Sequence, residues 1–369
     1  MAKNFTISNF KRWLTPAGLT AIALVACAEV FWAPYVAPEQ VFAFDQNNYD
    51  RPGRQDYEAM RVLLTYPQKT PDIAILGSSR PRDGGLVPEL KKILAAQTGQ
   101  SFEIVNYAAV GFRAFDLEVL AKRLTEDPRT TPKMVFLPVN PRFLQERAHR
   151  DNLRFTLMRS GQLIDDIRQH GIESPLHITE TLLSNAVSHL FALRLSAREW
   201  VEGELPNEFS PLTQNPIFGG YVKLQNQDLA WQAKNKPITS IVNAPLKQDR
   251  LSAYVAVEWP EGVNHLGAKE KEAFENGLRT FKAAGVKVVL MDLPMSDALK
   301  NAIPQVGFPE YHQYLAATAK SMQLDFVPVE GFPTFTDDDF REQSHVNRAG
   351  ALKLTRFLAD WIHENSTNF

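Results

Sequence analysis

Three short, largely apolar segments recur in the first half of the chain, at Ile73 to Leu76, Phe102 to Ala108 and Lys133 to Val139. The first is too short for a free-standing helix and is rich in β-branched residues, which favours a strand. The third is almost continuously apolar, as expected for a parallel strand that is covered on both faces. Strand–loop–helix units in series predict a doubly wound α/β fold with a mostly parallel sheet, whose ligand crevice lies at the carboxyl ends of the strands.

The same alternation resumes near the C-terminus. Its expected helices lie at Ala268 to Ala284, at Tyr311 to Met322 and from about Arg348 onward, and its expected strands lie between them, at Val286 to Leu293 and Asp325 to Val329. Apolar residues recur along the last helix at helical spacing, so that helix should pack one face against the sheet. We therefore expect these elements to complete the α/β core.

Composition divides the chain into five parts. They are an N-terminal anchor, a polar linker with a short helix around Tyr57 to Leu64, the first half of the core, an inserted region and the second half of the core, at residues 1–37, 38–69, 70–141, 142–265 and 266–369. The inserted region lacks the strand–helix alternation and is too long for a connecting loop. We expect it to form a helical or irregular cap over the crevice, with helices at Leu163 to His170 and Leu182 to Val201. A cover that only completes the fold is the alternative.

The N-terminus has the character of a targeting segment. Lys3, Lys11 and Arg12 precede an apolar stretch from Leu14 to Ala28 that continues into aromatic residues. Together these give about the 20 residues that cross a bilayer. The prediction is an uncleaved signal anchor that leaves the basic flank in the cytoplasm and the body of the protein outside it. A lipoprotein cleaved before Cys27 and a secreted, cleaved protein are the alternatives.

Charge and cysteine content exclude several classes of protein. The 40 basic and 42 acidic residues give a net charge of −2, and no long basic run suggests nucleic acid as a partner. A single cysteine excludes an internal disulfide framework and a thiolate metal cage. No metal or cofactor is predicted.

Ser79 is the candidate nucleophile. It follows the first apolar segment in the turn Gly77-Ser78-Ser79, and helical spacing resumes at Leu86. A serine on such a turn is lifted above the end of the sheet, where nearby backbone N–H groups can face the charge that develops when its oxygen attacks a carbonyl group. An ordinary turn and a phosphate cradle are the alternatives, although no lysine follows the serines as a phosphate-binding loop requires.

A serine nucleophile needs a base, and the base needs an orienting acid. Three histidines have a carboxylate three residues earlier, in the pairs Glu146/His149, Glu342/His345 and Asp360/His363. Only His345 lies in a loop between the last expected strand and the last expected helix, which returns it to the edge of the sheet where Ser79 lies. His345 is therefore the candidate base.

These residues follow the order of four sequence blocks. Gly77-Ser78-Ser79 follows the first strand, Gly111 the second and Asn140 the third, and Glu342-x-x-His345 lies in the last loop. In this order the chain resembles the SGNH (GDSL-type) hydrolase superfamily over residues 70–145 and 266–365. It departs from the usual blocks by having Ser78 in place of aspartate, Pro138-Val-Asn140-Pro141 in the third block, and glutamate as the acid.

The resemblance implies a role for each residue. Ser79 would be the nucleophile and His345 the base, oriented by Glu342 or, if the loop folds back, by Asp339. The oxyanion hole would consist of the N–H groups of Ser79 and Gly111 and the side-chain amide of Asn140.

The N-terminal anchor, the Gly-Ser-Ser turn and the final His-x-Asn-x-x-Gly most resemble membrane-anchored SGNH proteins that work beside membrane-bound O-acyltransferases on extracytoplasmic polysaccharides. The expected function is that of an anchored, periplasmic or cell-surface serine esterase or O-acyltransferase. It would act without a cofactor on acyl groups, acetyl first among them, of a polysaccharide. The alternative is a catalytically inactive SGNH-like domain that binds polysaccharide or serves as a scaffold for a membrane O-acyltransferase.

Overall fold

The computed structural model describes residues 60, 63–64, 69–145, 157–158, 266–302, 308–341 and 344–365. The expected anchor, most of the linker and its short helix, and both helices expected in the insert lie outside this part of the chain. Within it, no helix is long and apolar enough to cross a membrane.

Five parallel strands form one sheet. In the order β2-β1-β3-β4-β5, the strands are Ile104–Asn106, Ile73–Ile75, Met134–Val139, Lys287–Asp292 and Asp325–Val327. Ile75 pairs with Asn106 on one side and with Phe136 on the other, so β1 lies between the second and third strands of the chain. The parallel α/β class expected from the sequence is confirmed. The crossovers leave β1 and β3 in opposite directions, which opens a crevice at their carboxyl ends.

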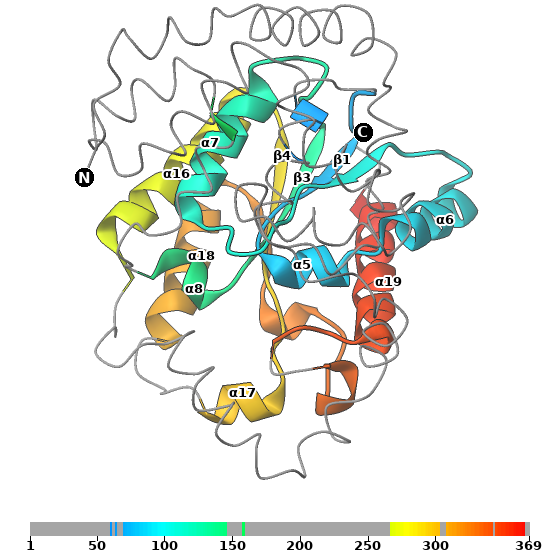
Figure 1. The fold of residues 1–369 in the computed structure, drawn as a ribbon, viewed down its shortest axis with the longest axis vertical. Coiled ribbons are helices and arrows are strands. Elements are labelled where there is room, and N and C mark those ends of the chain that lie inside the picture. Colours follow the sequence, from blue (N-terminus) through cyan, green and yellow to red (C-terminus); the bar gives the residue numbers. More distant parts are fainter. Residues whose placement is uncertain are drawn as a thin grey trace, which may run out of the picture. The chain divides into compact units, whose positions relative to one another are not determined.

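Helices cover both faces of the sheet (Figure 1). On one face lie α6 (Val87–Thr98) and α19 (Arg348–Asn365), and on the other α7 (Ala114–Thr125), α16 (Ala268–Ala283) and α18 (Phe308–Met322). This arrangement explains why every residue of β1 and β3 is buried. Strands covered on both faces cannot alternate between polar and apolar side chains.

The two helical layers pack differently. The predicted apolar face of α19 places Leu354, Leu358 and Ile362 in a buried cluster with side chains of α6 and of the strands. On the opposite face, α16 approaches α7 so closely that a Cβ atom at Gly277 would lie 2.8 Å from the side chain of Leu117. A larger residue at Gly277 would therefore push the two helices apart.

Three helices were not expected, namely α5 (Ser79–Gly84), α8 (Pro141–Leu144) and α17 (Asp297–Ala302). The expectation that Ser79 lies on a turn followed by a helix at Leu86 is corrected by α5, which begins at Ser79 itself. Its residues show no apolar periodicity, so the sequence carries no signal for this helix. Pro81 is accommodated because it lies in the first turn, where a backbone N–H has no partner inside the helix.

The two ends of the insert meet. Gln145 and Leu266 form an isolated antiparallel β-bridge, and the Gly267 N–H donates to the carbonyl oxygen of Leu144 at 2.9 Å. The insert therefore leaves the core after α8 and rejoins it at the start of α16 from nearly the same point.

Candidate active site

Gly77 turns the chain from β1 into α5. Its φ of +114° is unfavourable for residues with a side chain, and a Cβ atom there would lie 2.8 Å from the carbonyl oxygen of Pro138 on the neighbouring strand. Glycine is thus required both by the backbone conformation and by the space available. The turn places Ser79 above the carboxyl end of β1.

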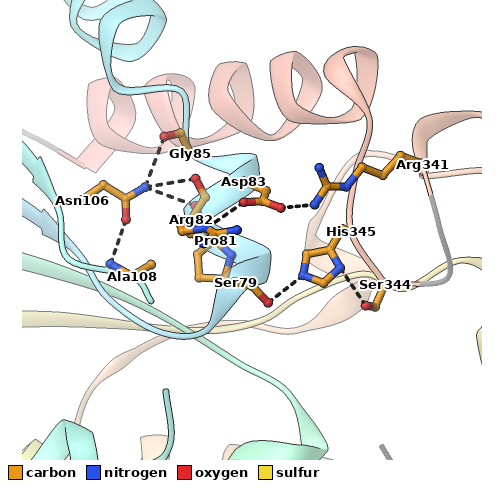
Figure 2. A network of polar contacts seen from close by, with 10 residues as sticks. All are labelled: Ser79, Pro81, Arg82, Asp83, Gly85, Asn106, Ala108, Arg341, Ser344 and His345. Atoms are coloured by element: carbon orange, nitrogen blue, oxygen red, sulfur yellow. Dashed lines mark hydrogen bonds and ion pairs between the residues drawn. The ribbon is translucent and has the colours of Figure 1, made fainter. Parts of the chain in front are cut away.

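Asn106, the last residue of β2, anchors α5 from the side (Figure 2). Its buried side-chain amide donates to the carbonyl oxygens of Pro81 at 3.3 Å and Gly85 at 3.4 Å, and its Oδ1 accepts from the N–H of Ala108 at 3.0 Å. The last carbonyl groups of a helix have no partner inside it, and a helix as short as α5 depends on outside donors. Asn106 therefore ties the nucleophile-bearing helix to the neighbouring strand.

The imidazole of His345 contacts Ser79. His345 Nε2 lies 2.6 Å from Ser79 Oγ, and Nδ1 lies 3.3 Å from the hydroxyl of the buried Ser344 (Figure 2). Phe340 and Val346 form a β-bridge, and the Arg341 N–H donates to the His345 carbonyl oxygen at 3.0 Å, so His345 is held beside the chain that enters its loop. With the ring proton on Nδ1, Nε2 is free to accept the serine proton.

A buried ion pair joins the histidine loop to the nucleophile helix. The Asp83 side chain in α5, only 2% exposed, accepts from Arg82 Nε at 2.9 Å and from the guanidinium of Arg341. A backbone hydrogen bond joins Arg341 to His345, and Figure 2 shows both side chains directed toward α5. The pair therefore fixes the position of the base relative to Ser79.

Ser79 and His345 share one cavity with the two other residues expected in the oxyanion hole, Gly111 and Asn140. The cavity has a volume of about 50 Å³. Asn140 Nδ2 donates to Ser78 Oγ at 3.1 Å, which leaves its second N–H for another acceptor. Within the described part of the chain, the backbone N–H groups of Ser79 and Gly111 have no acceptor. The cavity is therefore lined by residues that carry three N–H donors, the kind of group that stabilises an oxyanion.

The structure describes only one of the two candidate acids. Glu342 lies outside the described residues. Asp339 is buried, and its carboxylate accepts from the Thr336 N–H at 2.9 Å and from Lys353 Nζ at 2.5 Å. His345 is not among its partners, so the structure brings together Ser79, Gly111, Asn140 and His345 but not Asp339.

A second polar cluster lies at the carboxyl end of β4. The buried Asp292 accepts from the Tyr311 hydroxyl at 3.0 Å and lies 2.5 Å from His312 Nδ1. The hydrogen bond to Asp292 raises the pKa of His312 above its ordinary value. Asp292, Tyr311 and His312 do not line the cavity around Ser79. No group of three or more potential metal ligands occurs among the residues that the structure describes.

Four residues that shape the site were not found from the sequence. They are Asn106, Asp83, Arg341 and Ser344. A polar residue at the end of a buried parallel strand is the one signal that points to Asn106. Asp83 and Arg341 lie far apart in the chain, so no local pattern joins them.

No protein-family model matches the chain, and no curated protein matches its sequence.

Proposed function

We propose that this protein is a serine esterase or O-acyltransferase of the SGNH type. The observation that carries the proposal is the 2.6 Å contact between Ser79 Oγ and His345 Nε2, because it places a base within proton-transfer distance of a nucleophile. The cavity around this pair also contains Gly111 and Asn140, which supports an oxyanion hole of the SGNH kind.

In the first step, Ser79 Oγ attacks the carbonyl carbon of an ester while its proton passes to His345 Nε2. The carbonyl oxygen becomes an oxyanion that accepts from the N–H groups of Ser79 and Gly111 and from the Asn140 amide. As the tetrahedral state collapses, the imidazolium returns the proton to the leaving alkoxide. The products are a free hydroxyl compound and an acyl ester on Ser79.

In the second step, His345 takes a proton from an incoming hydroxyl group, and the oxygen of that group attacks the acyl-enzyme. Ser79 leaves with the proton returned by the imidazolium. Water as the acceptor gives hydrolysis, and a sugar hydroxyl gives O-acyl transfer. The same residues serve both outcomes, so access to the crevice decides between them.

Labelling with a fluorophosphonate tests the proposal directly, since this reagent modifies only a serine that is activated as a nucleophile. The wild-type protein should be labelled, and Ser79→Ala and His345→Ala should each abolish labelling while the fold is kept. In ester hydrolysis the double variant should be hardly worse than either single one, because such residues act as a unit. A wild-type protein that is folded but not labelled would favour the inactive, scaffolding alternative.

The proposal extends to the surroundings of the site. The apolar N-terminal segment is proposed to anchor the protein in a membrane, with the site in the periplasm or at the cell surface. The insert is proposed to form a cap that receives an acylated polysaccharide, in cooperation with a membrane-bound O-acyltransferase. Fractionation of cells, followed by proteolysis of intact spheroplasts, tests the orientation.

A further inference from the structure

An arginine accompanies each of the three segments that supply the proposed oxyanion hole. Arg80 follows Ser79 directly, Arg113 is two residues after Gly111, and Arg142 is two residues after Asn140. These segments follow three different strands, so nothing in the local sequence requires the arginines to meet. All three nevertheless line the cavity that contains Ser79 and His345.

Arginine is the charged residue type in the described part of the cavity lining. Among the described residues around the cavity, three are arginines and none is an aspartate or a glutamate. The nearby Asp83 is engaged by Arg82 and Arg341, and Asp116 accepts from the backbone N–H of Arg113 at 2.8 Å. Neither of these carboxylates reaches the cavity lining.

Guanidinium groups are suited to one class of ligand. They stay charged at all physiological pH values and present a fork of donors that matches carboxylate, phosphate or sulfate oxygens. A cavity with low-dielectric walls and one sign of charge concentrates ligands of the opposite sign. A neutral acetyl ester on a neutral sugar would leave the charge of these groups unmatched.

We propose that the site takes acyl esters that carry an anionic group beside the ester bond. The inference rests on the proposed esterase chemistry and names its substrate class. Arg113 and Arg142 are the residues to test, since Arg80 is buried and lies close enough to Tyr311 for its charge to lower that hydroxyl's pKa, against the dominant effect of burial.

Two pairs of esters separate the contribution of charge. 4-Acetoxybenzoate and its methyl ester differ by an anion on the alcohol side. The mono-4-nitrophenyl ester of terephthalic acid and its methyl ester differ by an anion on the acyl side, where the para carboxylate cannot attack its own ester. Each kcat/KM is divided by the rate of spontaneous hydrolysis, which removes the intrinsic difference in reactivity. The wild-type protein should prefer the anion of at least one pair by about tenfold or more, and the preference should decline with added salt.

Arg113→Gln and Arg142→Gln should each reduce that preference by about tenfold, because each variant should lose more turnover of the anionic ester than of the neutral one. Arg113→Gln keeps the backbone N–H that Asp116 binds, so α7 retains its N-terminal hydrogen bond. Arg129→Gln is the matched control, because the Arg129 side chain is exposed. Arg129 precedes β3, so it lies at the amino ends of the strands, whereas the cavity lies at their carboxyl ends. Equal turnover within both ester pairs, or an equal loss for both members of a pair in Arg113→Gln, would overturn the inference.

A binding experiment separates failure of this inference from failure of the proposed function. Ser79→Ala protein is titrated with tetragalacturonate, with neutral maltotetraose and with inorganic phosphate. Tighter binding of the carboxylate or phosphate ligand than of maltotetraose, weakened by Arg142→Gln, supports an anion site even if no ester is hydrolysed. Indistinguishable affinities for the three ligands would remove the anion site even if Ser79 is an active nucleophile.

Discussion

Replacing Asp83 by asparagine should loosen the active site and destabilise the fold together. The carboxylate side chain is 2% exposed and serves two guanidinium groups, those of Arg82 and Arg341, whose side chains are 12% and 19% exposed. Removing one partner of a buried ion pair costs about 3–5 kcal/mol of unfolding free energy, because the remaining charge stays buried. Both arginines retain some access to water, so we expect the lower end, about 3 kcal/mol.

Arg341→Gln should cost less stability, about 1–2 kcal/mol, because Asp83 keeps its bond to Arg82. Its effect on reactivity should be larger in proportion. Arg341 holds the turn that carries His345, and a displacement of about 1 Å at a catalytic group costs about 10²-fold in rate. Fluorophosphonate labelling of Ser79 should therefore slow by at least about tenfold.

Urea unfolding followed by circular dichroism measures the free energy of unfolding. The rate of fluorophosphonate labelling under native conditions measures the reactivity of Ser79. The double variant Asp83→Asn/Arg341→Gln should lose less stability than the sum of the single losses. Arg279→Gln is the control, because the Arg279 side chain is exposed and its pair with Glu275 should contribute less than about 0.5 kcal/mol. Wild-type stability and wild-type labelling in Asp83→Asn would refute the role of this pair.

Three further predictions concern single residues. Asn140→Ala should slow acylation by about 10²–10³-fold in stopped-flow ester hydrolysis, and a change below about threefold would remove Asn140 from the oxyanion hole. Glu342→Gln should lose much activity while keeping the fold, whereas Asp339→Asn should mainly lower the urea midpoint; the reverse would make Asp339 the acid. Because Asp292 raises the pKa of His312, the stabilisation should be complete below about pH 6.5 and should decline as pH rises through the raised pKa. His312→Gln should flatten that decline in pH-dependent urea unfolding.

The strands, and the position of Ser79 and His345 at one edge of the sheet, could be predicted from the sequence. Continuous apolar runs such as Met134–Val139 identify strands that are buried on both faces. Residues that follow parallel strands converge at one edge of the sheet, so Gly111 and Asn140 could be placed near Ser79 without knowledge of side-chain positions.

The supports of the site could not be predicted in this way. The helix α5 depends on Asn106 binding its carbonyl groups from another strand, and the histidine loop depends on Asp83 binding Arg341. These contacts arise only after the sheet has formed. Asp339 shows that proximity in sequence can also mislead. It lies close to His345 in the chain and was a candidate acid, but its carboxylate caps a turn and binds Lys353.

The bridge between Gln145 and Leu266 makes the insert interchangeable. Both of its ends are held at one point of the core, so the length of chain between them is not constrained by the sheet. Closing a longer loop adds little entropic cost, about 0.6 kcal/mol for each doubling of its length. The length and sequence of the chain between Gln145 and Leu266 can therefore change while the pairing of Ser79 with His345 stays the same.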